Sequence, residues 1–477
     1  MLSEEIAYQI GRQMGFAPTA EQEHAMRTFA EFITFRRSEA VMILRGSAGT
    51  GKTTLAGAIV RTMVSLKQKV VLLAPTGRAA KVFGLQAGCQ AFTIHRKIYR
   101  QKTFSGENTA FNLNDNLHQD TLFVVDEASM ISNNGYSDLS FGSGCLLDDL
   151  IHYIYSGRNC RMMLIGDRAQ LPPVGDDESP ALCDEMLEGY GLTVWSADLN
   201  EVLRQSRQSG ILYNATVIRS MITHEDLTQL PKIRFSGFTD IKMVPGAELV
   251  DQLSTSYAQV GEDETMVVTR SNKRANIYNQ GIRNMILDRE EVLESGDMLM
   301  VVKNNYYWTK DDKQSPMAFI ANGDRAVVYR VRNTREFYGF HFADVWLRFP
   351  DYDDYEMKAT LCLDSLTSEA PALTREQQER LFNGVLEDYA DIPLKADRMK
   401  RLREDPYYNS LQVKYAYAAT CHKAQGGGWQ HVYIDQGYMT DDMLTPDYIH
   451  WLYTAFTRAT DQLFLVNWPK TQTEDGE

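Results

Sequence analysis

The sequence has no long hydrophobic run. No apolar segment approaches the ~20 residues that a membrane-spanning helix needs. Residues 1–16 lack the uninterrupted apolar core of a signal peptide and are typical of an amphipathic helix instead. We therefore expect neither a signal peptide nor a membrane partner.

Cysteine is scarce and scattered. The six cysteines show no C-x-x-C spacing and no pairing with histidine, so the sequence predicts no zinc site. Isolated thiols are typical of the reducing cytosol, and we expect a cytoplasmic protein. The residues are Cys89, Cys145, Cys160, Cys183, Cys362 and Cys421.

Positive charge is also in short supply. The chain has 49 Lys and Arg against 63 Asp and Glu, a formal net charge of −14. Because phosphate contacts depend on Lys and Arg, this argues against a broad basic surface but leaves room for a local basic groove. The 44% hydrophobic and 23% charged residues are ordinary for a globular protein, and 477 residues suffice for about three domains.

One motif stands out from this background. Gly46 to Thr53 fits G-x-x-x-x-G-K-[ST] and lies between the apolar run Val41 to Leu44 and a helical pattern. A loop in this context cradles phosphates with backbone N–H groups, while Lys52 reaches the β- and γ-phosphates and Thr53 binds Mg²⁺. The alternative is a chance glycine-rich turn.

Gln22 lies about two dozen residues before this loop. Its amide offers both a donor and an acceptor and could read the edge of adenine, although a lone surface glutamine carries no meaning. The expected nucleotide-binding residues are Gln22, Gly46, Ser47, Ala48, Gly49, Thr50, Gly51, Lys52, Thr53 and Thr54.

Two adjacent carboxylates end the next apolar strand. Thr121 to Val125 leads directly into Asp126 and Glu127. In a P-loop protein Asp126 would hold Mg²⁺ and Glu127 could deprotonate a water, which favours hydrolysis over a kinase reaction. The alternative is a pair of exposed acids at a helix start.

Two further strands end in polar loops. Lys69 to Ala74 precedes Pro75 to Ala80, and Arg161 to Ile165 precedes Gly166 to Val174. Within the second loop, Gln170 could touch the γ-phosphate and the attacking water. Strands that alternate with helices predict a doubly wound parallel sheet with the nucleotide at one edge.

Taken together, the motifs resemble those of superfamily 1 helicases, in the RecD-like and Dda-like branch that includes the Pif-type enzymes. The resemblance covers most of the chain, and the motifs occur in the order typical of that family. They are Gly46 to Thr53, Ala74 to Ala80, Thr93 to His95, Asp126 to Ser129, Gly166 to Val174, Leu203 to Gln205, Val267 to Asn272, Tyr415 to Gly428 and Leu452 to Ala459.

The resemblance implies an α/β fold with two RecA-like P-loop domains and a small SH3-like β-barrel inserted in the second. We expect residues 1–195 to form the first domain, with 97–120 as an inserted hairpin. Residues 196–296 and 411–477 would form the second, and 297–410 the barrel with its helices. Short strand-like runs between 296 and 364 support the barrel, and Val413 to Thr420 is predicted to return to the second sheet.

The resemblance also assigns roles in ATP hydrolysis. Arg204 and Arg458 would be arginine fingers that stabilise the transferring phosphoryl group from the second domain, unless they are surface ion pairs. The expected catalytic residues are Lys52, Glu127, Gln170, Arg204 and Arg458, with Thr53 and Asp126 as metal ligands.

Single-stranded nucleic acid would cross the top of both domains. The residues expected to contact it are Pro75, Thr76, Thr93, His95, Thr420, His422 and Lys423, and Phe104 is a candidate for the wedge of a strand-separating pin. A flexible loop is the alternative for Phe104. Many relatives have a Glu after the Gln-Gly pair, but this chain has Gly427 and Gly428 before Trp429, which puts that ribose contact in doubt.

These expectations describe an ATP-dependent, Mg²⁺-dependent DNA helicase that acts on single strands and on single-strand/duplex junctions, moving 5′ to 3′. We expect a monomer, with DNA-repair or replication proteins as candidate partners. An RNA helicase and a non-unwinding ATP-switched binding module stay open as alternatives, and recognition of the RNA 2′-OH cannot be read from sequence.

Overall fold

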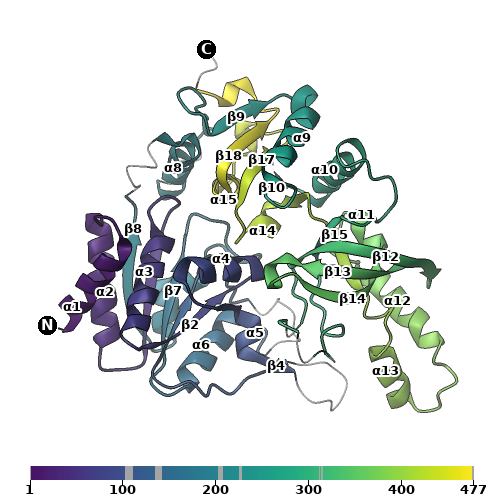
Figure 1. The fold of residues 1–477 in the computed structure, drawn as a ribbon, viewed down its shortest axis with the longest axis horizontal. Helices are drawn as coiled ribbons and strands as arrows, with labels where there is room; N and C mark the ends of the chain where they lie inside the picture. The colour runs from purple at the N-terminus through teal and green to yellow at the C-terminus, as the bar shows by residue number, and fades with distance from the viewer. Residues whose placement is uncertain are drawn as a thin grey trace.

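The computed structural model describes residues 2–101, 111–134, 142–201, 208–224, 228–310, 312, 315–317 and 319–474. The chain forms two units built on parallel sheets and one closed barrel, which confirms the predicted fold class. Figure 1 shows the N-terminal unit at the lower left, the second unit above it and the barrel at the right. Within the described residues, no helix has both the length and the hydropathy to cross a membrane.

The first unit is a six-stranded sheet in the order β3-β2-β6-β7-β1-β8, with all neighbours parallel. Alternate residues of β1 enter different hydrophobic clusters, Met42 and Leu44 on one face and Val41 and Ile43 on the other. Burial of both faces explains the continuous apolar run of this strand. The strands are β1 (Ala40–Gly46), β2 (Lys69–Ala74), β3 (Ala91–Thr93), β6 (Thr121–Val125), β7 (Arg161–Gly166) and β8 (Thr193–Leu199).

Threonine caps start several helices of the first unit. Thr19 and Gln22 form a reciprocal capping box at one of them, and Thr76 and Thr93 each accept a backbone N–H three residues later at two others. The helices are α1 (Leu2–Met14), α2 (Ala20–Thr34), α3 (Lys52–Ser65), α4 (Gly77–Ala87), α5 (Ile94–Ile98), α6 (Leu146–Ser156) and α7 (Asp184–Gly189).

The second unit has a five-stranded, all-parallel sheet in the order β16-β10-β17-β18-β9. Val267 and Val268 enter clusters on opposite faces, so this sheet is also buried on both sides. The strands are β9 (Ile241–Val244), β10 (Thr265–Thr269), β16 (Ala418–Thr420), β17 (Trp429–Asp435) and β18 (Ala459–Val466). The helices are α8 (Gly210–Thr223), α9 (Leu249–Val260), α10 (Asn272–Met285), α14 (Cys421–Ala424) and α15 (Pro446–Phe456).

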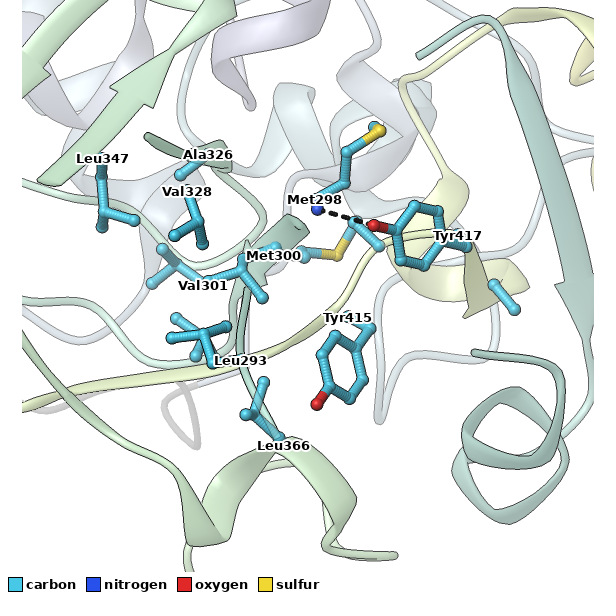
Figure 2. Packing of buried hydrophobic residues seen from close by; sticks show 14 of the residues in the cluster. Leu293, Met298, Met300, Val301, Ala326, Val328, Leu347, Leu366, Tyr415 and Tyr417 are labelled. Carbon is cyan, nitrogen blue, oxygen red and sulfur yellow. Dashed lines mark hydrogen bonds between the residues drawn. The ribbon is translucent and has the colours of Figure 1, made fainter. Parts of the chain in front are cut away.

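The barrel is closed by five strands, and its core is continuous with one face of the second sheet. Figure 2 shows this junction, where the Tyr417 hydroxyl accepts the backbone N–H of Met298 at 3.0 Å. The strands are β11 (Met298–Val301), β12 (Arg325–Phe337), β13 (Phe340–Phe349), β14 (Tyr355–Cys362) and β15 (Leu411–Tyr415). Three helices follow β14: α11 (Asp364–Thr367), α12 (Arg375–Glu387) and α13 (Lys395–Arg403).

Two of the predicted domain boundaries differ from those in the structure. The boundary at 195/196 falls inside β8, which pairs with β1 along its whole length and belongs to the first sheet. The strand predicted over Val413 to Thr420 is two strands, because β15 closes the barrel and only β16 enters the second sheet. Ala416 donates its N–H to Met298 of the barrel, and Tyr417 to the Asn279 side chain of α10, so the chain changes partners there.

The predicted insert, 97–120, contains two antiparallel strands. β4 (Tyr99–Gln101) pairs with β5 (Phe111–Leu113), and β4 continues directly from α5. Phe104, the candidate wedge, lies outside the described residues.

Candidate nucleotide cleft and nucleic-acid channel

The glycine-rich loop follows β1 and leads into α3. Gly49 and Gly51 have φ of 77° and 76°, a left-handed conformation that favours glycine. At Gly46 a Cβ would lie 2.9 Å from Thr50 Oγ1 and 3.1 Å from Leu199 Cβ, so only glycine fits there. Gly51, the N-cap of α3, provides no side-chain cap, and the first N–H groups of this helix are thus left for an anion.

Two side chains brace the loop. Lys52 Nζ donates to the carbonyl of Gly46 at 2.8 Å. Gln22 is fully buried, and its Nε2 donates to the carbonyl of Thr50 at 3.0 Å while its Oε1 accepts the N–H of Thr19. The predicted adenine contact differs from this arrangement, since the buried amide of Gln22 is bound to protein atoms and acts on the loop.

The acidic pair lies at the end of β6, beside β2 and β7 in the sheet. Burial, followed by the charge of Glu127, raises the pKa of Asp126 to about 7, and Lys52 opposes this shift. A nearby divalent cation would supply the missing positive charge, so the pair fits a Mg²⁺ site. Glu127 itself has a φ of 50°, a strained conformation for a residue other than glycine, of the kind found at functional sites.

Gln170 lies on the loop that follows β7. It is 5% exposed, and among the described residues its buried Oε1 has no hydrogen-bond partner. A buried amide oxygen without a partner is costly unless a ligand or water satisfies it. This observation fits the predicted place of Gln170 beside a phosphate-bound water.

The loop after β7 is bound to the second unit by α15 and by Gln425, which follows α14. The hydroxyl of Tyr453 donates to Asp167 Oδ2 at 2.6 Å and accepts the N–H of Ala48 at 3.1 Å. Leu171 donates its N–H to Thr454 Oγ1 at 2.7 Å and accepts from Gln425 at 2.8 Å. We call these contacts the interdomain seam.

The arginine that contacts the glycine-rich loop from the second unit was not predicted from the sequence. Arg219 of α8, in the second unit, donates to Ser47 Oγ at 2.9 Å and also to Asn200 Oδ1. Arg458 is 4% exposed and donates instead to its own unit, at Thr454, Gly427 and Thr457. Arg204 lies outside the described residues.

A cavity of about 240 Å³ lies between the glycine-rich loop and the second unit, beside their direct contacts. Ala48 and Gly49 line it from one side, and Thr457 and Ala459 from the other. The nucleotide-binding loop therefore faces the segment that carries Arg458.

A second cavity, of about 260 Å³, lies where the two units and the barrel meet. We call it the channel. Its lining comes from all three parts: Thr76, Arg78, Met130 and Val174 from the first unit, Met300, Asn322, Gly323 and Arg325 from the barrel, and His422, Lys423, Gln425, Gly427 and Trp429 from the second.

Arginine and lysine side chains, of which Arg325 is buried, give the channel positive charge. Arg78 lies over the Trp429 ring at 4.6 Å, and burial, with Arg325 nearby, lowers its pKa to about 10. Burial likewise lowers the pKa of Lys423 to about 8. Within the described residues, Nε of Arg78, Nε of Arg325 and Nε1 of Trp429 are buried without a hydrogen-bond acceptor, although the two arginines lie 3.7 Å from Glu264 and 3.6 Å from Asp351, respectively. The channel thus presents donors and positive charge, as a phosphate backbone requires.

The predicted nucleic-acid residues separate into two groups. Thr76, His422 and Lys423 line the channel. Thr93 caps α5, and His95 contacts Tyr99 and Phe319 instead.

Pro75 directly precedes Thr76, and Thr420 is the N-cap of α14 without a side-chain cap bond. No sequence motif marks Arg325, whereas Arg78 lies within the motif Ala74 to Ala80.

Comparison with known proteins agrees with this geometry. A family model described as an AAA domain matches residues 17–230, and one described as a UvrD-like helicase C-terminal domain matches 415–466. The ATP-dependent DNA helicase Dda of Enterobacteria phage T4 is 24% identical over 291 residues, which cover 60% of this chain and 61% of Dda. The ATP-dependent RecD2 DNA helicase of Deinococcus radiodurans is 33% identical over 135 residues, 28% of this chain and 16% of RecD2.

This chain spans less than two thirds of each of these two relatives. A solved structure of Pif1 helicase from Bacteroides in complex with ADP-AlF3 and ssDNA gives a TM-score of 0.46 at 15% identity, over 95% of this chain and 93% of that one.

A phosphate-binding loop after β1, carboxylates after β6 and a second parallel sheet across the cleft define a P-loop protein of the RecA-like class. Within this class, the chain is similar in sequence to superfamily 1 DNA helicases of the RecD-like and Dda-like branch, as its motifs predicted.

Proposed function

We propose that this protein is an ATP-dependent DNA helicase that moves along single-stranded DNA and separates the strands of a duplex. The observation that carries the proposal is that the loops of the nucleotide cleft continue into the channel. Met130 lines the channel three residues after Glu127, and Val174 lines it four residues after Gln170. A change at the phosphates would therefore move the wall of the channel.

The cleft residues have complementary roles in this proposal. The loop amides and Lys52 would hold the phosphates of ATP, and Thr53 and Asp126 would hold Mg²⁺, which would supply positive charge to the phosphate oxygens. Glu127 accepts a proton from the water that attacks the γ-phosphorus, while Gln170 orients this water. The bond between the γ-phosphorus and the bridging oxygen breaks, and ADP and phosphate result.

Arginines from the second unit complete the proposed cleft. Arg204 and Arg458 are the proposed fingers, and we add Arg219 because it already contacts the loop at Ser47. A guanidinium contributed from across a cleft makes hydrolysis depend on closure. Alternate closing and opening would shift the grip of the two units on the strand and produce a step.

The lining of the channel favours a nucleic-acid ligand that is bound through its sugar-phosphate backbone. Its cations and its N–H donors are suited to phosphates, with Lys423, His422 and Thr76 as proposed contacts. The 5′ to 3′ direction, the DNA-junction substrate and partners from repair or replication are part of the proposal on the strength of the family resemblance.

The test is ATP hydrolysis with and without single-stranded DNA, followed by unwinding of duplexes with a 5′ or a 3′ tail. We expect stimulation by DNA and unwinding only from the 5′ tail. A hydrolysis rate indifferent to DNA would refute the proposal. Stronger stimulation by RNA would favour an RNA helicase, and stimulated hydrolysis without unwinding would favour an ATP-switched binding module.

A further inference from the structure

The outer face of the barrel carries a row of cations around one tryptophan. Strands β12, β13 and β14 lie side by side at the right of Figure 1. Arg330 pairs in register with Trp346, and Trp346 with Lys358, so the three side chains share one face across three strands. Arg332 follows two residues later on β12. We call Arg330, Arg332, Trp346 and Lys358 the barrel cluster.

The three cations of the barrel cluster gather around Trp346, although Asp344 lies in register with Arg332. The Arg330 and Arg332 guanidinium carbons lie 5.8 and 5.7 Å from the centre of the Trp346 ring, and Lys358 Nζ lies 5.3 Å from it. All three cations are exposed. Within the described ranges, none of them forms an ion pair.

Neighbouring carboxylates have other partners. Asp344 forms an ion pair with Arg335, and Asp354 lies 3.8 Å from Arg348. Three like charges on one face repel one another, and the ring offsets this only in part. In a chain with a net charge of −14, such a cluster is unusual and indicates an anionic partner.

The tryptophan itself is not a stacking platform. Its ring is half-buried, and the three cations lie within 5.8 Å of its centre, so a nucleic-acid base would have to displace them in order to stack on it. The barrel cluster is thus suited to phosphates alone. A duplex exposes its phosphates and hides its base faces, whereas a single strand offers its bases for stacking.

The barrel also lies beside the hairpin that we expect to meet the duplex. Phe319, in the segment between β11 and β12, packs in one cluster with Ile98 and Tyr99 at the base of that hairpin. Its ring centre is 6.1 Å from that of His95. In addition, β12 starts at Arg325 in the channel, about 16 Å from Arg330 at ~3.3 Å per residue.

We propose that Arg330, Arg332 and Lys358 bind the phosphates of the duplex at a single-strand/duplex junction, while the channel holds the single strand. This inference rests on the proposed helicase function and adds a second contact surface to it. The contact is independent of base sequence, because it involves phosphates only.

The test compares two charge-reversal variants of the full chain. R330E/K358E changes the barrel cluster, and K400E/R401E makes the same change in charge at exposed positions of α13, outside the barrel strands. Fluorescence anisotropy measures the binding of a duplex with a 5′ single-stranded tail, and of the tail alone, between 50 and 200 mM salt, two concentrations chosen to give a measurable slope.

We expect R330E/K358E to bind the tailed duplex about tenfold more weakly and to lower the slope of log K against log salt by about two, since each lost phosphate contact removes about 0.9. Binding of the tail alone and DNA-stimulated ATP hydrolysis should be unchanged, and K400E/R401E should behave as the unmodified protein. The neutral variant R330Q/K358Q should show a smaller loss of the same kind.

An equal loss for the tailed duplex and the tail alone would overturn the inference, as would an equal loss in K400E/R401E or no loss at all. Hydrolysis by the unmodified protein that does not respond to single-stranded DNA would overturn the proposed function, and this inference with it. Normal stimulation with unchanged junction binding in R330E/K358E would overturn the inference alone.

Discussion

The interdomain seam can be tested by removing one oxygen atom, with Tyr453→Phe. The hydroxyl is 2.6 Å from Asp167 Oδ2 and 3.1 Å from the N–H of Ala48, and both Tyr453 and Asp167 are buried. Asp167 would keep one other bond, from the N–H of Ala169. A hydrogen bond to a charged group contributes about 1.5–3 kcal/mol, so we expect a loss of about 2–3 kcal/mol.

This loss of free energy weakens the contact between the two units. At about 1.4 kcal/mol per factor of ten, it corresponds to a shift of about 30- to 150-fold away from the arrangement in which the loop after β7 contacts α15. If hydrolysis requires this arrangement, kcat for DNA-stimulated ATP hydrolysis should fall by at least about tenfold.

Tyr448→Phe is the matched control on the same helix. Its hydroxyl donates to Gln436 within the second unit, so its removal should lower stability without a comparable fall in kcat. Urea unfolding and steady-state hydrolysis of both variants provide the comparison. If Tyr453→Phe kept kcat within twofold, or if Tyr448→Phe reduced it equally, the seam would not couple the units.

Three further predictions concern single residues. Lys52→Ala should lower ATP hydrolysis by at least about 100-fold while single-stranded DNA still binds, and normal turnover in this variant would exclude the glycine-rich loop as the site. Arg219→Ala should lower kcat by about 10- to 100-fold with little change in unfolding, whereas a purely structural role predicts the reverse pattern. Asp324 has a pKa raised to about 7 by burial, above its unfolded value, so its contribution to stability is complete below about pH 4 and is lost as pH rises through 7. Urea unfolding should therefore show that the unmodified protein loses up to about 4 kcal/mol more than Asp324→Asn between pH 4 and pH 8, and parallel pH profiles would contradict this.

The parts of the cleft that follow strand ends were predictable from the sequence. β1, β6 and β7 are neighbours in a parallel sheet, so their carboxyl ends bring Lys52, Asp126 and Gln170 to the same edge. Motif spacing combined with the rule for parallel sheets is sufficient for this step. The predicted roles of these residues in catalysis stay predictions until they are measured.

Contacts between distant elements were not predictable in this way. Arg219 lies on a helix without a motif, and it reaches Ser47 across the cleft only because α8 packs against α15 within the second unit. The division between β15 and β16 lies in an unbroken apolar run, where no glycine or proline marks the change of partner. The position of Gln22 under the loop depends on how α2 packs, which its surface-like sequence context does not reveal.

The place where the chain enters and leaves the barrel has a consequence for folding. The N–H of Ala416 donates to the carbonyl of Met298 at 2.9 Å, so the chain enters and leaves the barrel at adjacent points. Without the barrel, pairing β10 with β16 would close a loop of about 150 residues, at an entropic cost of about 4 kcal/mol. A barrel that forms first shortens this loop to about 30 residues and lowers the cost by about 1.4 kcal/mol. The inserted barrel then favours the pairing of β10 with β16 and so speeds the completion of the second sheet.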